Sequence, residues 1–407
     1  MVRRTVIGVT LVGFAVALMA ARSVPKSPWP DRVTAHEWGT FTTVAGEDGR
    51  AIEWLPLSGP TDLPCFVEHF QNSSTLKILP TEDARLIDYE AARSRLWGKV
   101  RMETPVLYFY GPRETALNVQ VRFPRGLITE WYPHAKATNM GVTSTSLRAP
   151  QFSSMIDWGR VVIAPATDAS VPKENGTSHY YAARETESSP LGVGRQTEKF
   201  LFYRGVANFD VPLSARVAKA DSVELRNLGS DAIPNVVIFE RRGSKLGYRI
   251  GGELKAGMTL ADPPLNGSLD GLRADLYRML TDAGLFPKEA SAMLETWRDS
   301  WFEDGVRVFY IVPRKSVDAI LPLSISPAPS AIARVFVGRM EVLTADVQQT
   351  VETAIARGDS ATLGRYARFL APISDRILAK RPSAASAIRA ATEAAYKSYV
   401  RRSTVCE

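Results

Sequence analysis

The chain has 407 residues, of which 45% are hydrophobic and 23% are charged, so it holds enough apolar material for one large core or two domains. Its formal net charge is +7, but the basic residues are scattered and form no run of five or six. This distribution argues against a nucleic-acid-binding function, and no nucleic-acid partner is expected.

The first segment has the pattern of an export signal. Arg3 and Arg4 precede seventeen uncharged residues, 5–21, which would form a helix about 26 Å long, near the lower limit for crossing a bilayer. The cleavage pattern at its end is poor because Met19 stands three positions before the site, which favours a retained anchor over a cleaved signal. We therefore expect a cell-membrane protein with a single N-terminal pass through residues 5–21 and an extracytoplasmic bulk. A cleaved leader would instead give a periplasmic or secreted protein.

The remainder divides into three regions after a proline-rich spacer. The predicted segments are 1–33 (signal or anchor helix and spacer), 34–255 (β-rich domain), 256–343 (mixed α/β segment) and 344–407 (helical C-terminal segment). The predicted fold class is α+β. A β-sandwich-like N-terminal body precedes a C-terminal α-rich region, and one transmembrane or signal helix precedes both.

Strands dominate the expectation for 34–255. In the segment Leu117–Phe123 apolar and polar residues alternate, which predicts a strand with one solvated face. The runs "PVLYFYG", "RVVIAP" and "KFLFYRG" are continuously apolar and predict strands buried on both faces. A tight turn is expected at Arg242–Lys245. Many short strands separated by Gly, Pro and Asn favour a sandwich.

Helices are predicted after residue 256. Ser268 is placed to cap a helix that ends at Gly284, and a second helix follows Pro287, with Trp297 and Trp301 still at helical spacing. Two apolar strands, "VRVFYIVP" and "ARVFVGRMEVL", come next. Helices are then expected after Thr344, from Ser360 and after Pro382, and their apolar stripes indicate packing faces.

Several familiar catalytic motifs are missing from the sequence. It contains no phosphate-binding glycine loop, no G-x-S-x-G nucleophile elbow and no C-x-x-C pair. The segment "HEWGT" has Thr40 where a zinc-protease helix requires its second histidine. None of these enzyme classes is therefore expected.

What remains is a group of polar residues embedded in aromatic-rich strand ends. Three of them are histidines that could bind a divalent metal: His36, His134 and His179. The others are candidates for acid–base or electrostatic catalysis: Glu37, Glu103, Glu130, Asp157, Arg184, Glu198 and Arg204. Carboxylates beside tryptophans would also suit glycan chemistry.

A structural interpretation of the same residues stays open. On a regular strand His36 and Glu37 face opposite sides, so both could serve one site only if the strand is irregular near Gly39. If residues 178–182 form a strand, His179 shares a face with Tyr181. The buried glutamates and arginines could simply form ion pairs that fix the strand order. Four tryptophans allow either a sugar-stacking platform or core packing: Trp38, Trp54, Trp131 and Trp158.

Cys65 and Cys406 are the only cysteines. Outside the cytoplasm an even number of cysteines permits a disulfide, which here would close a very long loop. The alternative is two unpaired thiols.

The chain resembles an uncharacterised family of exported, membrane-anchored bacterial proteins. The segments that carry the resemblance are "HEWGTFT", "ETPVLYFY", "GLITEWYP", "EKFLFYRG" and "DSWFEDGVRVFYIVP", and together they cover roughly residues 34–345. The resemblance implies export but no known activity, cofactor or catalytic residue.

Two functional hypotheses follow. The first is a binding or envelope-associated role with a protein or glycan partner, because no intact catalytic motif is present. The second is a metal-dependent or carboxylate-based hydrolase that acts on an extracytoplasmic substrate, because histidines and glutamates gather in the β region.

Overall fold

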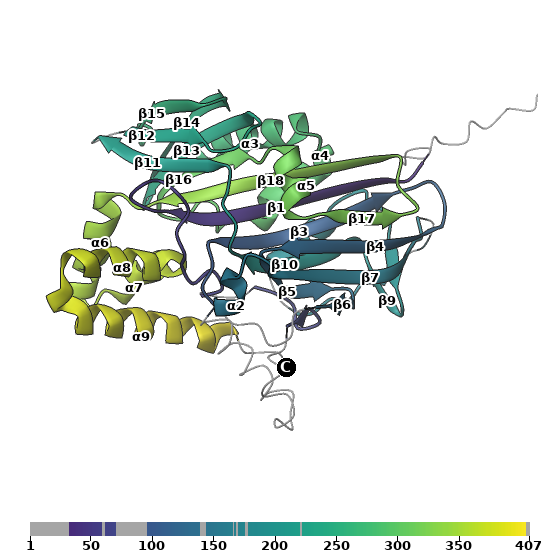
Figure 1. Cartoon of the computed structure of the whole chain (residues 1–407), viewed down its shortest axis with the longest axis horizontal. Coiled ribbons are helices and arrows are strands. Elements are labelled where there is room, and N and C mark those ends of the chain that lie inside the picture. Colours follow the sequence, from purple (N-terminus) through teal and green to yellow (C-terminus); the bar gives the residue numbers. More distant parts are fainter. Residues whose placement is uncertain are drawn as a thin grey trace, which may run out of the picture.

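The computed structural model describes residues 32–58, 62–70, 96–138, 144–165, 167, 170–175, 178–219 and 222–403. They form a mixed α+β structure in which three β-sheets are followed by C-terminal helices (Figure 1). The predicted leader, residues 5–21, lies outside the described residues. Within the described residues, no helix combines the length and the apolar character needed to cross a membrane.

The largest sheet has nine strands. In spatial order they are β14 (Lys245–Leu254), β13 (Ile233–Arg242), β16 (Gly305–Ile311), β18 (Ala331–Val342), β1 (Thr34–Ala45), β3 (Val100–Tyr110), β10 (Leu201–Ala207), β5 (Gly126–Tyr132) and β2 (Glu68–His69). β1 pairs in parallel with β18 along its whole length, from Thr34 opposite Ala331 to Ala45 opposite Val342. The region boundary expected at residue 255 therefore falls inside one continuous sheet.

Two smaller sheets share a hydrophobic core with one face of the nine-stranded sheet. One contains β17 (Leu323–Ser326), β4 (Thr115–Pro124), β7 (Ser153–Ile163), β8 (Leu191–Val193) and β9 (Gln196–Glu198), with β6 (Lys136–Ala137) paired to β7; the other contains β11 (Leu213–Lys219), β12 (Ser222–Asn227) and β15 (Gly257–Ala261). The alternation predicted for β4 is confirmed, because its apolar side chains from Leu117 to Phe123 are buried in this core.

Helices cover the opposite face of the nine-stranded sheet. There α3 (Leu269–Asp282), α4 (Pro287–Thr296) and the 3₁₀ helix η1 (His179–Arg184) contribute to a second, aromatic-rich core. Strong tertiary packing of one apolar stripe explains the position of each helix. The short helices α2 (Ser144–Arg148) and α5 (Arg314–Ile320) lie in connections between strands.

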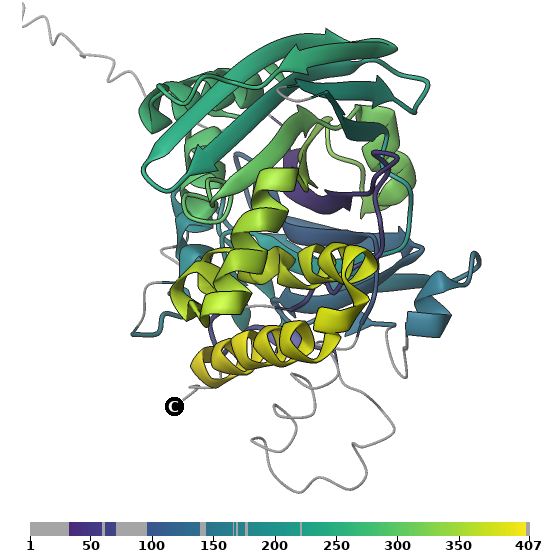
Figure 2. The ribbon, with the colours of Figure 1, turned by 90° about the vertical axis from the view of Figure 1, so that its left-hand side faces the viewer.

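The C-terminal helices form a third core against the ends of β1 and β18 (Figures 1 and 2). They are α6 (Ala345–Arg357), α7 (Ser360–Arg365), η2 (Ala367–Phe369), α8 (Leu370–Lys380), η3 (Pro382–Ala384) and α9 (Ala385–Ser403). Val44 and Leu343, at the strand ends, join this core. Figure 2 shows the helices in front of the sheets at this end of the molecule.

Three of the predicted helix boundaries are confirmed, and two other local predictions are wrong. Ser268 and Thr344 accept the expected N-cap hydrogen bonds, and Gly358 ends α6 in the left-handed conformation at φ 66°. The helix after Pro287 ends at Thr296, so the two tryptophans expected on it lie in the following loop. Residues 179–184 form a 3₁₀ helix, so the strand considered there, with its shared face for His179, is wrong.

Candidate functional site

An irregularity in β3 shapes the helix-covered face of the sheet. Against β1, Trp38 pairs with Val106 but Thr40 pairs with Glu103, so β3 has one residue more than β1 between these two pairs. Thr104, in this bulge, has φ 47°, a left-handed conformation that costs a β-branched residue energy. The strand is therefore strained at the point where its polar side chains meet the helix layer.

A small cavity of about 60 Å³ lies beside this bulge. β3, β10, η1, η2 and the loop that follows α4 all contribute to its wall. We call it the arginine pocket, and its polar lining residues are Asp62, Arg101, Thr104, His179, Tyr180, Arg204, Thr296, Trp297, Ser300 and Arg368. Two of the residues expected from sequence are associated with it directly, since Arg204 and His179 both line it.

Glu103 is the carboxylate at the centre of the ion pairs around this pocket, and it is fully buried. Arg368 donates through Nη1 to Glu103 Oε1 at 2.7 Å, and Arg101 Nε lies 3.2 Å from the same oxygen. A second carboxylate, Glu303, accepts from Arg339 Nη2 at 2.9 Å and lies 3.7 Å from Arg368 Nε. Ion pairs thus join three arginines and two glutamates into one network.

The electrostatic balance of this network is visible at Glu103. Burial raises the pKa of this carboxyl, but the positive charges of the surrounding arginines, Arg368 first, outweigh burial and hold the pKa of Glu103 below its ordinary value. The arginines that act on it include Arg339 and Arg204 as well as Arg101. All four guanidinium groups therefore lie within electrostatic range of one carboxylate.

Arg204 differs from the other arginines of the network. Its side chain is buried, and within the described chain no carboxylate lies within ion-pairing distance of it. Its nearest acceptor is Thr104 Oγ1, which is 3.4 Å from both Nε and Nη2. An arginine is ionised at every physiological pH, so this is a buried positive charge without a direct ion pair, although the buried Glu130 stands opposite it in the pairing of β5 with β10.

Four buried polar atoms of the pocket lining have no hydrogen-bond partner among the described residues. They are Arg204 Nη1, Arg368 Nε, Trp297 Nε1 and Ser300 Oγ. Three of the four can only donate a hydrogen bond, and the serine hydroxyl can do so. Such unpaired groups are rare in folded proteins, so their grouping around one cavity indicates a binding site for an acceptor.

His179 lies at the edge of the same pocket. Its Nδ1 is 3.1 Å from Asp62 Oδ2 and its Nε2 is 2.9 Å from Asp299 Oδ2. Both aspartates are substantially exposed, at 48% and 71% of their side chains. An imidazole held between two carboxylates suits acid–base chemistry. The three residues lie on the solvent side of the arginines.

His36, by contrast, belongs to the packing of α4. Its Nδ1 is 2.9 Å from Glu289 Oε2, and Glu289 also accepts from the Tyr110 hydroxyl at 2.7 Å and from the backbone of Phe286. The imidazole lies against the rings of Tyr110 and Phe286. These contacts tie the start of β1 to the start of α4.

His134 is exposed, and its Nδ1 lies 2.8 Å from Glu68 Oε1. The three histidines thus have three different sets of acidic partners and are not brought together. In the described part of the chain, no group of three or more His, Cys, Asp or Glu residues could hold a metal ion.

Two of the predicted carboxylates form compact ion pairs. Glu37 faces the core between the sheets, where it accepts from Arg334 Nε at 2.5 Å and from the Tyr203 hydroxyl at 2.5 Å. Glu198 accepts from Arg184 through both of its oxygens, with Nε to Oε1 at 2.9 Å and Nη2 to Oε2 at 2.5 Å. Both pairs fit the structural interpretation, since each charge has a direct partner.

The remaining predicted residues do not line the arginine pocket, although Glu130 stands opposite Arg204 in the pairing of β5 with β10. Glu130 is buried on β5 beside Thr129, whose hydroxyl donates to it. Asp157 accepts from the backbone nitrogen of Gly159 at 2.8 Å and shapes the bend in β7. The four tryptophans considered for sugar stacking are all buried, with at most 7% of their surface exposed: Trp38, Trp54, Trp131 and Trp158.

Cys65 is disulfide-bonded. The only other cysteine of the sequence, Cys406, lies outside the described residues.

Sequence reasoning missed most of the arginine pocket. Arg101 and Arg339 each stand in a buried strand between apolar neighbours, which is the signal that identified Arg204. Arg368 and Trp297 follow helical patterns in the sequence and gave no such signal. Their role becomes visible only when residues 265 positions apart, Glu103 and Arg368, are seen in contact.

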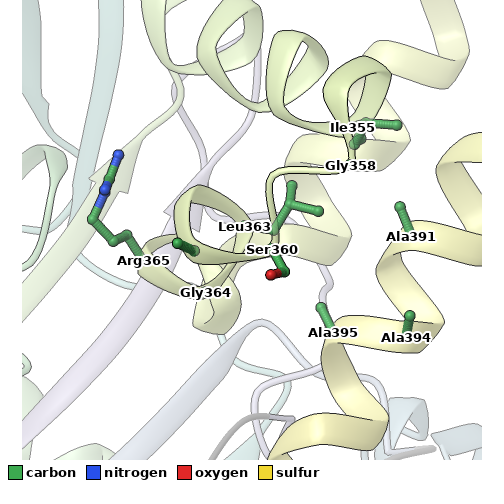
Figure 3. A pocket seen from close by; sticks show the side chains of 10 residues that line it. Ile355, Gly358, Ser360, Leu363, Gly364, Arg365, Ala391, Ala394 and Ala395 are labelled. Carbon is green, nitrogen blue, oxygen red and sulfur yellow. The ribbon is translucent and has the colours of Figure 1, made fainter.

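A larger cavity of about 610 Å³ lies between α6, α7 and α9 (Figure 3). Leu363 and the alanines of α9, including Ala391 and Ala395, line it, while Arg365 points away from them. Arg365 Nε lies 3.2 Å from Asp304. Among the described lining residues no buried polar side-chain atom lacks a partner, so this cavity shows no chemical preference beyond apolar contact.

Comparison with known protein families finds no match, and no curated protein matches the chain. The functional assignment therefore rests on the geometry of the site.

Proposed function

We propose that this protein is exported, remains tethered to the membrane by residues 5–21 or is released into the periplasm, and binds an anionic ligand in the arginine pocket. The leader sequence supports export, and the resemblance to exported proteins points the same way. The binding role corresponds to the first of the two hypotheses from the sequence. The anionic group can be part of a small molecule or of a glycan or protein partner.

One observation carries the proposal: four buried donor groups that have no hydrogen-bond partner among the described residues surround one small cavity, and one of them belongs to an arginine without an ion pair. Ion pairs join Arg101, Arg339 and Arg368 to Glu103 and Glu303, and Arg204 lines the same pocket without an ion pair among the described residues. Burying an uncompensated charge is costly, and proteins normally pair such charges or use them to bind ions. An anion in the pocket would supply the missing hydrogen-bond acceptors and a direct partner for the Arg204 charge.

Ligand-induced stabilisation tests this function. We expect small anions to raise the midpoint of thermal unfolding of the full-length, detergent-solubilised protein in a concentration-dependent way, because a ligand that binds only the folded state stabilises it. Arg204→Met should abolish the effect. Arg216→Met is the matched control, since Arg216 is half-exposed and pairs with Glu224 on the small sheet. Equal responses of the wild type and Arg204→Met to every anion would refute the proposal.

A hydrolase is the second candidate, and His179 is the observation that favours it. The imidazole between two aspartates at the pocket edge could act as an acid or base on an ester of the bound anion. A carboxylate-based mechanism has less support, because each carboxylate expected from sequence is engaged by its own partner. The metal-dependent form has less support because no three potential metal ligands lie together among the described residues. Turnover of an ester that binds in the pocket, lost in His179→Ala, would favour this alternative.

A further inference from the structure

We infer that Thr104 is a positioning residue for the arginine pocket: its hydroxyl holds the guanidinium of Arg204 so that Nη1 faces the bound anion. This inference rests on the proposed anion-binding function and identifies a residue that prepares the site. Three features carry it: the backbone conformation of Thr104, the side of the sheet on which its side chain lies, and its contacts with Arg204.

The backbone of Thr104 is strained. Its φ of 47° lies in the left-handed region, where a β-branched residue is rarely found. Pro105 follows it, and the residue before a proline normally adopts an extended conformation. Such strain persists only where the surrounding structure imposes it, and strained residues cluster at functional sites.

The strain belongs to a bulge that interrupts the pairing of β3 on both of its sides. Between the pairs Phe202–Val106 and Gly205–Met102, β3 has three residues where β10 has two, and the pairing with β1 shifts at the same place. Met102 packs in the core between the sheets, whereas Val106 packs in the core under the helices. Residues an even number apart share a face in a regular strand, so the bulge reverses the facing of β3.

This reversal brings the side chain of Thr104 to the pocket. If β3 continued regularly from Met102, Thr104 would face the core between the sheets, because residues two positions apart share a face. In the bulge Thr104 lines the arginine pocket together with Arg101, and it is only 2% exposed. The bulge therefore supplies the pocket wall with one buried hydroxyl.

The hydroxyl contacts one edge of the Arg204 guanidinium. Thr104 Oγ1 accepts from both Nε and Nη2 at 3.4 Å, and Nη1 has no partner among the described residues. The guanidinium is rigid and planar, so a contact that holds one edge also fixes the direction of Nη1. The pocket thus presents this donor in one orientation before a ligand arrives.

A neighbouring carboxylate explains why Arg204 needs to be held. Glu130 is buried and stands opposite Arg204 in the pairing of β5 with β10, so the two side chains share a face of the sheet. A guanidinium free to rotate could turn towards this carboxylate and away from the pocket. The two contacts with Thr104 oppose that rotation.

Removal of the hydroxyl without loss of the branched side chain is the direct test. Thr104→Val offers no acceptor to Arg204, so the affinity of the full-length, detergent-solubilised protein for sulfate should fall about tenfold in a calorimetric titration. Thr104→Ser keeps the hydroxyl and should bind within about threefold of the wild type. Inorganic phosphate or acetate replaces sulfate if the wild type binds it more tightly.

Thr43→Val is the matched control. The Thr43 hydroxyl is also buried, has no partner among the described residues and belongs to β1, but Thr43 does not line the pocket. This variant should bind sulfate as the wild type does.

A double replacement separates positioning from direct contact with the ligand. Lysine has no Nε–Nη2 edge for Thr104 to hold, so in an Arg204→Lys background Thr104→Val should weaken sulfate binding by less than about threefold. An undiminished effect would show that the hydroxyl contacts the anion itself, and the positioning role would be wrong.

The strain is tested on the anion-free protein. Glycine adopts a left-handed conformation without steric cost, so Thr104→Gly should unfold at a higher temperature than Thr104→Ala, which reverses their order in an ordinary strand. Both variants lack the hydroxyl and should bind sulfate as weakly as Thr104→Val. A lower unfolding midpoint for Thr104→Gly would overturn the claim that strain is held at this residue.

The binding results separate this inference from the function on which it rests. If Thr104→Val binds sulfate as tightly as the wild type, or no more weakly than Thr43→Val, the positioning role is wrong and anion binding stands. If the wild type binds none of sulfate, inorganic phosphate and acetate, both are wrong.

Discussion

Two buried arginines in neighbouring parts of the helix-covered face have opposite surroundings. Arg184 makes a two-point contact with Glu198 and lies over the ring of Tyr181, with 4.9 Å between the guanidinium carbon and the ring centre. Arg204 has no carboxylate partner among the described residues, and its only polar contacts to them are two of 3.4 Å to Thr104. Both side chains are about equally buried, at 9% exposure.

The difference shows that burial alone does not distinguish a structural charge from a functional one. The carboxylate of Glu198 also accepts from Tyr180 and from a backbone nitrogen, so that pair is complete within the protein. Around Arg204, by contrast, the Nη1 atom of the guanidinium and the neighbouring donors of Trp297 and Ser300 have no direct acceptor among the described residues. A charged group with all its partners stabilises the fold, whereas one that lacks them is available to a ligand.

Replacing each of the two arginines with methionine should give the largest effect and tests the contrast between them directly. Arg184→Met leaves Glu198 buried without its partner and should lower the free energy of unfolding by about 3–5 kcal/mol. Arg204→Met removes a charge that has no direct ion pair and should leave the anion-free protein within about 1 kcal/mol of the wild type, or more stable. Urea unfolding in buffer without multivalent anions measures both values. Similar losses in the two variants would show that Arg204 is structural.

The pH dependence of the free energy of unfolding tests the role of Glu103. Because the folded state lowers the pKa of this carboxyl below the ordinary 4.5, its contribution is complete well above that pH. The contribution is lost as the pH falls through the folded pKa. Glu103→Gln should therefore be less stable than the wild type by about 2 kcal/mol near neutral pH, and the gap should close in acid.

Parallel urea unfolding of the two proteins between roughly pH 7 and pH 3 gives this difference directly, since the effects of other carboxyl groups cancel. A gap that stays constant over this range would mean that the arginines do not hold the charge of Glu103.

The smallest predicted effect concerns a single neutral donor. Trp297→Phe keeps an aromatic ring but removes Nε1 from the pocket wall, so the affinity for sulfate should fall roughly fivefold, or about 1 kcal/mol. Trp301→Phe is the matched control, because its Nε1 is also unpaired among the described residues but Trp301 does not line the pocket. Equal affinities of the two variants in a calorimetric titration would place the indole of Trp297 outside the binding site.

Local features of the fold could be predicted from the sequence, because local interactions determine them. The alternation in β4 and the helix caps at Ser268 and Thr344 depend on residues only a few positions apart. The 3₁₀ helix at His179 could not be read in this way, because its conformation depends partly on Asp62, which accepts from its backbone at 2.7 Å from 117 positions away.

The candidate site was predictable only in part, for the same reason. Glu103 and Arg204 stood out as charges within apolar strands, and Arg339 could have been found by that criterion. Which buried charge would lack a partner depended on the strand order, and in particular on the position of β18 beside β1. No spacing in the sequence indicates that pairing.

The parallel contact between β1 and β18 also has a consequence for how the chain reaches its native state. Glu37 and Arg334, which meet across these strands, are 297 positions apart, so ribosomes that add about 5–20 residues per second would separate their synthesis by roughly 15–60 s. During this interval the first strand has an uncovered edge that could pair with other chains. A holding chaperone that shields the nascent N-terminal strand would therefore be expected to raise the yield of the mature protein.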